Sequence, residues 1–224
     1  MPTNEQMVDV MIDLETAGLR SGAAVFSLGA VVMDLDGTDN WESLQTSPFG
    51  GLGTLTTNLR LVDQVKAGLH MDPNTLLWWL DQNDTARTEL TSGQSKAANP
   101  GVVLSEFNEW LEFVTSSDLM DGNLPVRIWS NGANFDAPIL RAVYDALGIE
   151  CPWPYWLERC YRTYRKTVEP ILEAQGKTVP DKNRSPEQNK HTALDDALHQ
   201  AWMMTQYSRL LKVPDAKEPL YLFS

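Results

Sequence analysis

The chain has 224 residues, of which 42% are hydrophobic, a net charge of −12 and a pI near 4.6. Its length suits one domain, 1–224, with a substantial core, and no apolar run is long enough to span a bilayer. With two cysteines the chain lacks a disulfide framework, and its acidity excludes the strongly basic proteins that bind long duplexes through phosphates. The N-terminus lacks the features of a signal peptide, so we expect a cytoplasmic protein.

The first predicted element is a strand that begins at Val8 and carries Asp13 and Glu15 at its end. Residues two apart on a strand share a face, so both carboxylates point the same way. Neighbouring carboxylates repel one another and lose solvation when buried. A divalent cation can compensate, because carboxylate oxygens are the ligands that hard cations prefer. Taken alone, the pattern is more typical of a strand end with two solvated acids.

Further elements are predicted from hydrophobic periodicity and from turn and cap residues. They are strands over 25–35 and 55–61, a hairpin turn at 34–37, helices over 73–80, 102–114 and 168–175, and a loop over 94–101. The helix at 73–80 has Asp72 as its expected N-cap. Because Trp78 and Trp79 are adjacent on this helix, only one of them can face the core. The other either stacks on a base or covers a neighbouring helix.

A second acid lies where a strand passes into a helix. A strand is predicted over 126–129, a turn of small and polar residues follows over 130–134, and a helix runs to Leu147 with Gly148 at its C-cap. Asp136 lies in the first turn of this helix. The simplest explanation is that a carboxylate favours a helix N-terminus, and only its combination with other acids indicates a site.

A third motif opens the last long helix, which is predicted over 194–211. Asp195 and Asp196 point about 100° apart on a helix, so one should face the sheet and the other solvent. His191 precedes Asp196 by five residues and ends the polar loop 181–190. Such a histidine either swings into a site or is an ordinary surface residue. Residues 213–224 are expected to form a C-terminal arm.

Taken together, the three motifs resemble those of the DEDDh group of 3′–5′ exonucleases in the ribonuclease H-like superfamily. This group includes proofreading exonucleases, ribonuclease T and oligoribonuclease. The matching segments are Asp13-Leu14-Glu15-Thr16-Ala17-Gly18, Gly132-Ala133-Asn134-Phe135-Asp136 and His191-Thr192-Ala193-Leu194-Asp195-Asp196-Ala197. The chain also looks like the small exonucleases encoded by phages. It departs from many relatives at Asn131-Gly132, where they carry a His-Asn pair.

The resemblance implies an α/β fold with a ribonuclease H-like mixed β-sheet flanked by α-helices. It also implies hydrolysis of DNA or RNA from the 3′ end to nucleoside 5′-monophosphates, with two divalent cations, Mg²⁺ or Mn²⁺, that stabilise the attacking and leaving oxygens. The expected ligands are Asp13, Glu15, Asp136 and Asp196. We expect His191 to accept the proton of the attacking water, because its ordinary pKa suits that role near neutral pH.

Four further residues are expected beside the terminal nucleotide; they are Thr16, Gly18, Trp78 and Phe135. The expected partners are 3′ ends of single-stranded or short nucleic acids, with no membrane. The basic residues at 159–166 alternate with tyrosines and either contact nucleic acid or form a solvated helix face. The aromatic segment 153–156 is either core or the interface of a homodimer. The alternatives for function are an endonuclease or resolvase on the same fold, or a non-catalytic nucleic-acid-binding module.

Overall fold

The structure is a computed structural model that describes residues 7–33, 35, 53–82, 84–116, 123–180 and 192–211, without the side chains at 85, 86 and 89. Five strands form one mixed sheet in the order β3-β2-β1-β4-β5. The strands are β1 (Val8–Thr16), β2 (Val25–Met33), β3 (Thr54–Asn58), β4 (Val126–Ser130) and β5 (Glu158–Cys160). The first three strands pair antiparallel as a meander, and β1, β4 and β5 pair parallel. This confirms the predicted fold class.

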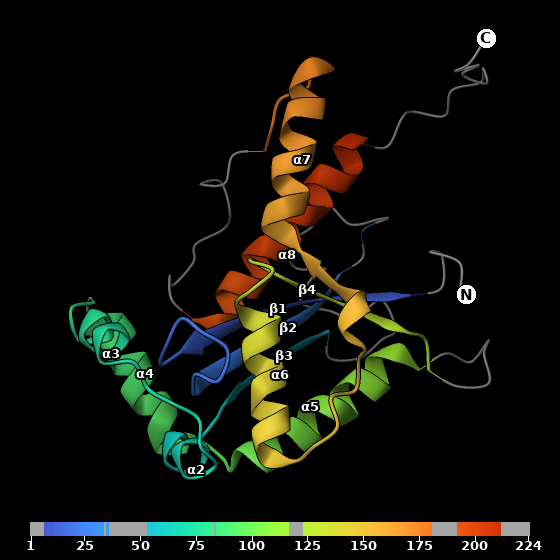
Figure 1. Ribbon diagram of the computed structural model, residues 1–224. Coiled ribbons are helices and arrows are strands. Elements are labelled where there is room, and N and C mark those ends of the chain that lie inside the picture. The colour runs from blue at the N-terminus through green and yellow to red at the C-terminus, as the bar shows by residue number, and fades with distance from the viewer. Residues whose placement is uncertain are drawn as a thin grey trace.

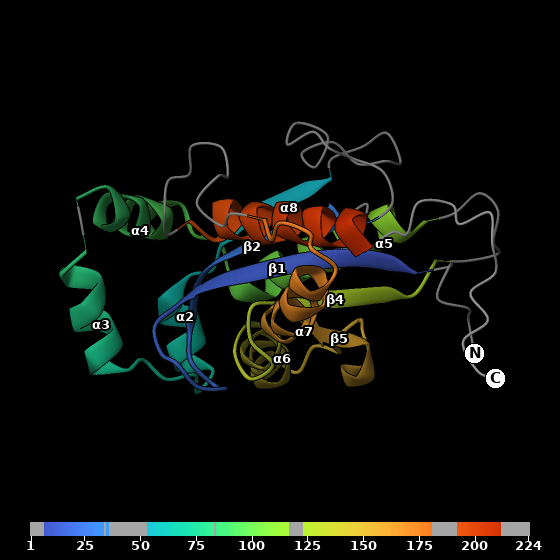
Figure 2. The same cartoon turned by 90° about the horizontal axis from the view of Figure 1, so that it is seen from above.

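Helices cover both faces of the sheet, with α7 and α8 on one side and α5 and α6 on the other (Figure 1). The view in Figure 2 shows α8 lying along β1 and β2. The helices are α2 (Leu61–Lys66), α3 (Pro73–Leu80), α4 (Asp84–Lys96), α5 (Pro100–Thr115), α6 (Asp136–Leu147), α7 (Tyr161–Ala174) and α8 (Ala193–Leu211), with a short 3-10 helix η1 (Tyr155–Leu157) before β5. None of the helices in the described part of the chain is long and apolar enough to cross a membrane.

The side chains of β1 alternate between the two helical layers. Val10, Ile12 and Leu14 pack with α5 and α6 in one hydrophobic cluster, whereas Met11 packs with α7 and α8 in the other. Asp13 and Glu15 continue the face of Met11, so strand geometry directs both carboxylates toward α8. The alternation of apolar and polar residues in the sequence therefore decides on which side of the sheet the acids lie.

A glycine on β2 allows α8 to lie close to this part of the sheet. Gly29 pairs with Asp13 across the antiparallel ladder. A Cβ atom at Gly29 would lie 2.3 Å from the carbonyl carbon of Ala193 and 2.4 Å from the backbone nitrogen of Leu194. Such distances are not tolerated between non-bonded atoms, and both neighbours are backbone. The absence of a side chain at Gly29 thus lets the first turn of α8 pack directly over the strand that carries Asp13.

Several predicted boundaries match the structure and others do not. The strand predicted over 55–61 ends at Asn58, and α2 begins at Leu61. Asp72 caps α3 as predicted, since its Oδ1 accepts hydrogen bonds from the backbone nitrogens of Asn74 and Thr75 at 2.8 and 3.1 Å. The loop predicted over 94–101 is shorter in the structure and spans 97–99, because α4 extends to Lys96 and α5 begins at Pro100. The helix predicted over 168–175 begins earlier, at Tyr161.

Other predictions fall on residues that the structure does not describe. These are most of the turn at 34–37, the loop at 181–190, His191 and the arm at 213–224. In the aromatic segment 153–156, Trp153 is part of the core, whereas Tyr155 and Trp156 are exposed. The core alternative is therefore right for Trp153 only.

Candidate active site

Three acids from two distant parts of the chain meet where β1 approaches α8. Asp13, Glu15 and Asp196 each offer a carboxylate oxygen, and these oxygens lie within 4.8 Å of one another. Asp13 and Glu15 share the face of β1 that is directed at α8, and Asp196 lies in the first turn of that helix. Asp195 is not a member of the group. The structure thus selects Asp196 as the sheet-facing member of the pair.

Asp136 approaches the same strand from the N-terminus of α6. Its Oδ1 accepts a hydrogen bond of 3.1 Å from the backbone nitrogen of Leu14, the residue between Asp13 and Glu15. The side chain is 1% exposed, and its Oδ2 has no hydrogen-bond partner within the described ranges. A buried carboxylate oxygen without a donor is costly. Asp136 therefore lies beside the three clustered acids with one oxygen available.

Burial raises the pKa values of Asp13 and Asp136. Burial raises the pKa of Asp13 well above its usual range, and the negative charges of Asp136, Asp196 and Glu15 raise it further. Burial also raises the pKa of Asp136 to about 7, although the hydrogen bond from Leu14 and the charge of Arg162 act in the opposite direction. Shifts of this kind, caused by burial and like charge together, are characteristic of functional sites.

Asp9 lies on the same face of β1 as Asp13, but its carboxylate is paired with other side chains of the protein. Arg127 donates hydrogen bonds of 2.7 and 2.6 Å to its two oxygens, and the Nε1 of Trp129 donates another of 2.6 Å. Asp9 is therefore neutralised by a guanidinium. Asp13, four residues further along, forms no salt bridge with a described lysine or arginine. Burial without a protein cation distinguishes Asp13 from a structural acid.

The four acids fit a divalent-cation site. The donor set consists of carboxylate oxygens, which suits hard cations such as Mg²⁺ and Mn²⁺. A cation would give the unpartnered Oδ2 of Asp136 a positive neighbour and would relieve the repulsion that raises the pKa of Asp13. The arrangement of these residues therefore supports divalent metal binding, while the identity of the metal stays a prediction.

A glutamine that the sequence analysis missed holds one of the acids. The Nε2 of Gln200 donates a hydrogen bond of 2.7 Å to the Oδ1 of Asp13. Gln200 is buried, and it follows Asp196 by one helical turn, so both side chains point to the same side of α8. This hydrogen bond opposes the rise in the pKa of Asp13. The only signal in the sequence is a polar residue at i+4 from a predicted ligand, on an otherwise apolar face.

A cavity of about 770 Å³ opens beside the acids, between β1, α3 and the start of α6. Its lining includes Glu15 and three of the predicted substrate-binding residues, which are Thr16, Trp78 and Phe135. This volume lies within the ~300–1,000 Å³ that is usual for small-molecule ligands. Gly18 is not in the lining; it packs against Ala23, and its carbonyl oxygen accepts the hydroxyl of Thr16 at 2.8 Å. The structure thus gives Gly18 a place in the turn rather than in the cavity.

The two adjacent tryptophans have different environments, as the helical spacing requires. Trp79 is 4% exposed, and its Nε1 donates a hydrogen bond of 3.0 Å to the carbonyl oxygen of Thr16. Trp78 is 47% exposed and packs edge-on against Trp79, with ring centroids 5.0 Å apart. Trp78 therefore presents an accessible aromatic surface to the cavity, whereas Trp79 is a fixed part of its wall.

One residue of the predicted basic segment lies at the site. The guanidinium of Arg162 on α7 donates a hydrogen bond of 2.8 Å to the carbonyl oxygen of Asn131. Its charge lowers the pKa of Asp136. Arg162 thus supports the turn at Asn131-Gly132, where the sequence departs from many DEDDh relatives.

Comparisons with known proteins agree with this geometry. A family model described as the 3′-5′ exoribonuclease Rv2179c-like domain matches residues 8–208. No curated protein sequence matches the chain significantly.

Among solved structures, the chain is similar to the nuclease domain of 3′hExo, a DEDDh family member bound to rAMP. The TM-score is 0.51 and the identity 11%, over 92% of this chain and 93% of that one. It is also similar to a zinc-bound complex of E. coli ExoI with ssDNA, with a TM-score of 0.56 and 14% identity over 89% of this chain and 40% of that one. A third similar structure is S. pombe Pop2p with Mg²⁺ and Mn²⁺, with a TM-score of 0.50 and 14% identity over 88% and 81% of the two chains. At these identities the likeness shows the fold.

Proposed function

Since the chain belongs to the Rv2179c-like family of 3′–5′ exoribonuclease domains, we propose that it hydrolyses RNA from the 3′ end with two divalent cations and releases nucleoside 5′-monophosphates. The observation that carries the proposal is the convergence of Asp13, Glu15 and Asp196 within 4.8 Å, with buried Asp136 beside them. The family description favours RNA over DNA. The narrower similarity to phage-encoded exonucleases stays a prediction.

The four acids would hold the cations, with Asp13 as the shared ligand because it interacts with all three others. When bound, the cations stabilise negative charge on the attacking and leaving oxygens of the phosphodiester. Gln200 would keep the carboxylate of Asp13 in one orientation, and the backbone nitrogen of Leu14 would do the same for Asp136. Fixing the ligands before substrate arrives reduces the reorganisation needed during the reaction.

The cavity of about 770 Å³ would take the terminal nucleotide, with Trp78 stacking on its base. Water would then attack the phosphorus atom, and the bond from phosphorus to the 3′ oxygen of the shortened strand would break. We propose that His191, which lies outside the described residues, accepts the proton of this water. The released 3′ oxygen takes up a proton to complete the step.

A panel of end-labelled oligonucleotides tests the proposal. With Mn²⁺ present, 5′-labelled RNA should give a ladder that shortens one nucleotide at a time, and 3′-labelled RNA should release labelled mononucleotide first. DNA of the same sequence should be cut more slowly. Fragments from internal cuts at early times would instead indicate an endonuclease, and faster cleavage of DNA would contradict the choice of RNA.

A pair of neighbouring acids provides matched variants for the same assay. Asp196→Asn should abolish cleavage and remove Mn²⁺ binding in calorimetry, because one ligand oxygen of the cluster loses its charge. Asp195→Asn is the same type of substitution one residue earlier, outside the cluster. This variant should retain most activity. Equal effects of the two substitutions would count against the assigned ligand set.

A homodimer also stays a proposal. Its support is the pair of exposed aromatic side chains at Tyr155 and Trp156, which are 71% and 64% exposed. Sedimentation equilibrium distinguishes a dimer from a monomer directly.

A further inference from the structure

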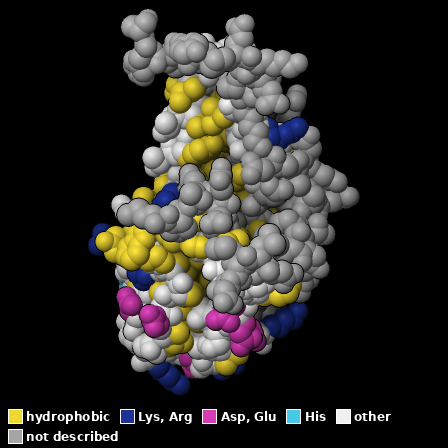
Figure 3. Space-filling model, turned by 90° about the vertical axis from the view of Figure 1, so that its right-hand side faces the viewer, with side chains coloured by type: hydrophobic (Ala, Val, Ile, Leu, Met, Phe, Trp, Pro, Cys, Tyr) yellow, Lys and Arg dark blue, Asp and Glu magenta, His cyan; other side chains and the backbone are white. Residues whose placement is uncertain are grey.

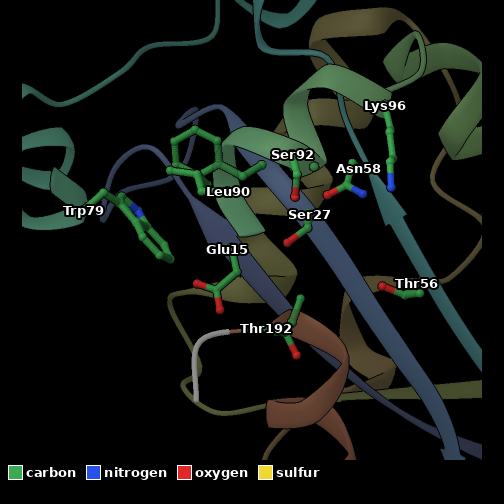
Figure 4. Close-up of a pocket in the computed structure, with 12 residues that line it drawn as sticks. Glu15, Ser27, Thr56, Asn58, Trp79, Leu90, Ser92, Lys96 and Thr192 are labelled. Carbon is green, nitrogen blue, oxygen red and sulfur yellow. The ribbon is translucent and has the colours of Figure 1, made fainter. Parts of the chain in front are cut away.

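A second cavity, distinct from the one assigned to the terminal nucleotide, opens on the other side of Trp79. It lies between the sheet and α4 and has a volume of about 230 Å³. Its polar lining comes mainly from β2, β3 and α4 and includes Ser27, Thr56, Asn58, Ser92 and Lys96. Figure 4 shows Trp79 at one end of this cavity, Lys96 at the other, and Glu15 at its floor.

Glu15 and Trp79 line both cavities, so these two residues form the boundary between them. Trp79 is held in place by its hydrogen bond to Thr16 and by edge-on contacts with Trp78 and Phe26. A phosphodiester at the acids has a nucleotide on each side. If the terminal nucleotide occupies the larger cavity, the strand must leave past Glu15, and the smaller cavity is the described space that it enters.

The volume decides what the smaller cavity can hold. About 230 Å³ is below the ~300–1,000 Å³ of pockets that enclose a whole ligand. It is sufficient for part of a nucleotide. Hydroxyl and amide groups line its middle, which suits a sugar and a phosphate better than an aromatic base.

Lys96 is the only cation in the lining of this cavity. Its ammonium forms no hydrogen bond or salt bridge with any described residue, and Figure 4 shows it directed alongside Asn58. In a chain with a net charge of −12, a lysine without an acidic partner beside an acidic site is suited to an anionic ligand. A phosphate of the substrate strand is such a ligand.

We propose that this cavity binds the sugar and phosphate of the nucleotide that precedes the 3′-terminal one, with Lys96 contacting the phosphate. The proposal rests on the exonuclease function proposed above. Both RNA and DNA carry this phosphate, so we expect the contact with either kind of strand. Cleavage of RNA and of DNA by the same variant is therefore compared.

Two substrates distinguish the proposed contact from catalysis. An RNA oligonucleotide carries the phosphate of the preceding nucleotide. In the p-nitrophenyl ester of uridine 5′-monophosphate, p-nitrophenol replaces that nucleotide as the leaving group, so the ester lacks the phosphate that Lys96 is proposed to contact. We expect Lys96→Ala to lower kcat/KM for the oligonucleotide relative to the ester by about tenfold, as for loss of one charged hydrogen bond, mainly through KM. Lys96→Arg keeps the charge and should restore most of the ratio. The matched control is Lys66→Ala, at the exposed end of α2 and outside both cavities, which should leave the ratio unchanged.

Gly93→Ala tests the cavity by a different route. A Cβ at this position would lie 2.7 Å from the Oδ1 of Asn58, the mobile end of a side chain, so Asn58 must move within the cavity. Alanine is favoured over glycine inside a helix, so α4 should remain folded. We expect this variant also to lower the ratio of oligonucleotide to ester cleavage.

An unchanged ratio in Lys96→Ala, or equal losses on both substrates, would overturn the proposal. The same holds if Lys96→Ala affects RNA but leaves DNA unaffected, since the phosphate is common to both. Failure of the wild-type protein to cleave either substrate would instead refute the proposed exonuclease function. The two failures are therefore distinguishable.

Discussion

At the scale of single residues, the acids of β1 differ in how the protein compensates their charge. Asp9 is paired with a guanidinium inside the structure, whereas Asp13 is surrounded by other acids and by one glutamine. The first arrangement contributes to folding without a ligand. The second makes the folded protein dependent on protons or cations, which is expected of a binding site rather than of a core.

This dependence predicts how stability varies with pH in the absence of metal. The pKa of Asp136 is about 7 in the folded protein and near 4 in an unfolded chain. Between these values the folded state holds the extra proton, so stability decreases as pH rises through this window. In EDTA, the Tm should therefore fall between about pH 4 and about pH 7. Mn²⁺ should raise the Tm most at the upper end, and Asp136→Asn should flatten the profile. A metal-free Tm that rises over this range would contradict the assigned shifts.

The clustered acids could be predicted from the sequence, but the residues around them could not. Asp13, Glu15 and Asp196 lie in short motifs whose spacing reflects strand and helix geometry, and the structure brings them together. Packing between distant segments places Gln200 beside Asp13 and places Lys96 and Glu15 in the lining of one cavity, and one sequence contains no local signal for either arrangement. His191 illustrates the remaining gap, because its motif is clear and its position lies outside the described residues.

At the scale of elements, the position of α8 depends on the missing side chain at Gly29. Gly29→Ala would place a methyl group against the backbone of Ala193 and Leu194, which cannot move without shifting the helix. We expect a loss of about 1–3 kcal/mol in the free energy of unfolding, as for other overpacked sites, measured by urea denaturation. We also expect weaker Mn²⁺ binding in calorimetry, because Asp196 moves with α8.

Gly101→Ala provides the control for this prediction. Its Cβ would meet two side chains, the oxygen of Asn99 at 3.2 Å and the Cδ1 of Ile149 at 3.9 Å. Gly101 lies on α5, which covers the other face of the sheet from α8. Mn²⁺ affinity should therefore be unchanged in this variant. Unchanged affinity in Gly29→Ala as well would show that α8 does not depend on that glycine for its position.

The elements that were predicted correctly carry strong local signals. The helix α3 has an aspartate cap and a proline in its first turn, and α6 ends at Gly148, whose φ of 67° suits glycine. By contrast, α4 is mostly polar, and its sequence contains no apolar stripe from which a helix could be inferred. Its contacts with the sheet, including that of Gly93 with Asn58, stabilise a helix that its own sequence favours only weakly. The missed helix therefore explains why the second cavity could not be anticipated.

At the scale of the whole molecule, the negative charge limits how the protein can hold nucleic acid. On the face shown in Figure 3, the described Lys and Arg side chains are scattered rather than gathered in a stripe. Because the chain has a net charge of −12, we expect a long strand to meet few cations outside the site. Binding should depend on the metals, on stacking and on one or two phosphate contacts.

The salt dependence of KM measures the number of these contacts. Each phosphate neutralised on a single strand contributes about 0.7 to the slope of log KM against log salt concentration. At constant Mn²⁺ we expect a slope between about 0.7 and 1.4 for an RNA oligonucleotide, and a shallower slope for the p-nitrophenyl ester. A slope of about 4 or more would indicate an extended basic surface and would contradict this view.

The fixed indole of Trp79 has a consequence for the step size of the enzyme. The Nε1 of Trp79 is hydrogen-bonded to the backbone of β1, the strand that carries Asp13 and Glu15. This hydrogen bond holds the indole in a fixed position relative to the two acids. If the terminal nucleotide occupies the larger cavity as proposed, only the part of a strand that fits on that side of Trp79 would be released in a single event. Product length would thus be determined by one immobile ring, independently of the base at the end of the strand.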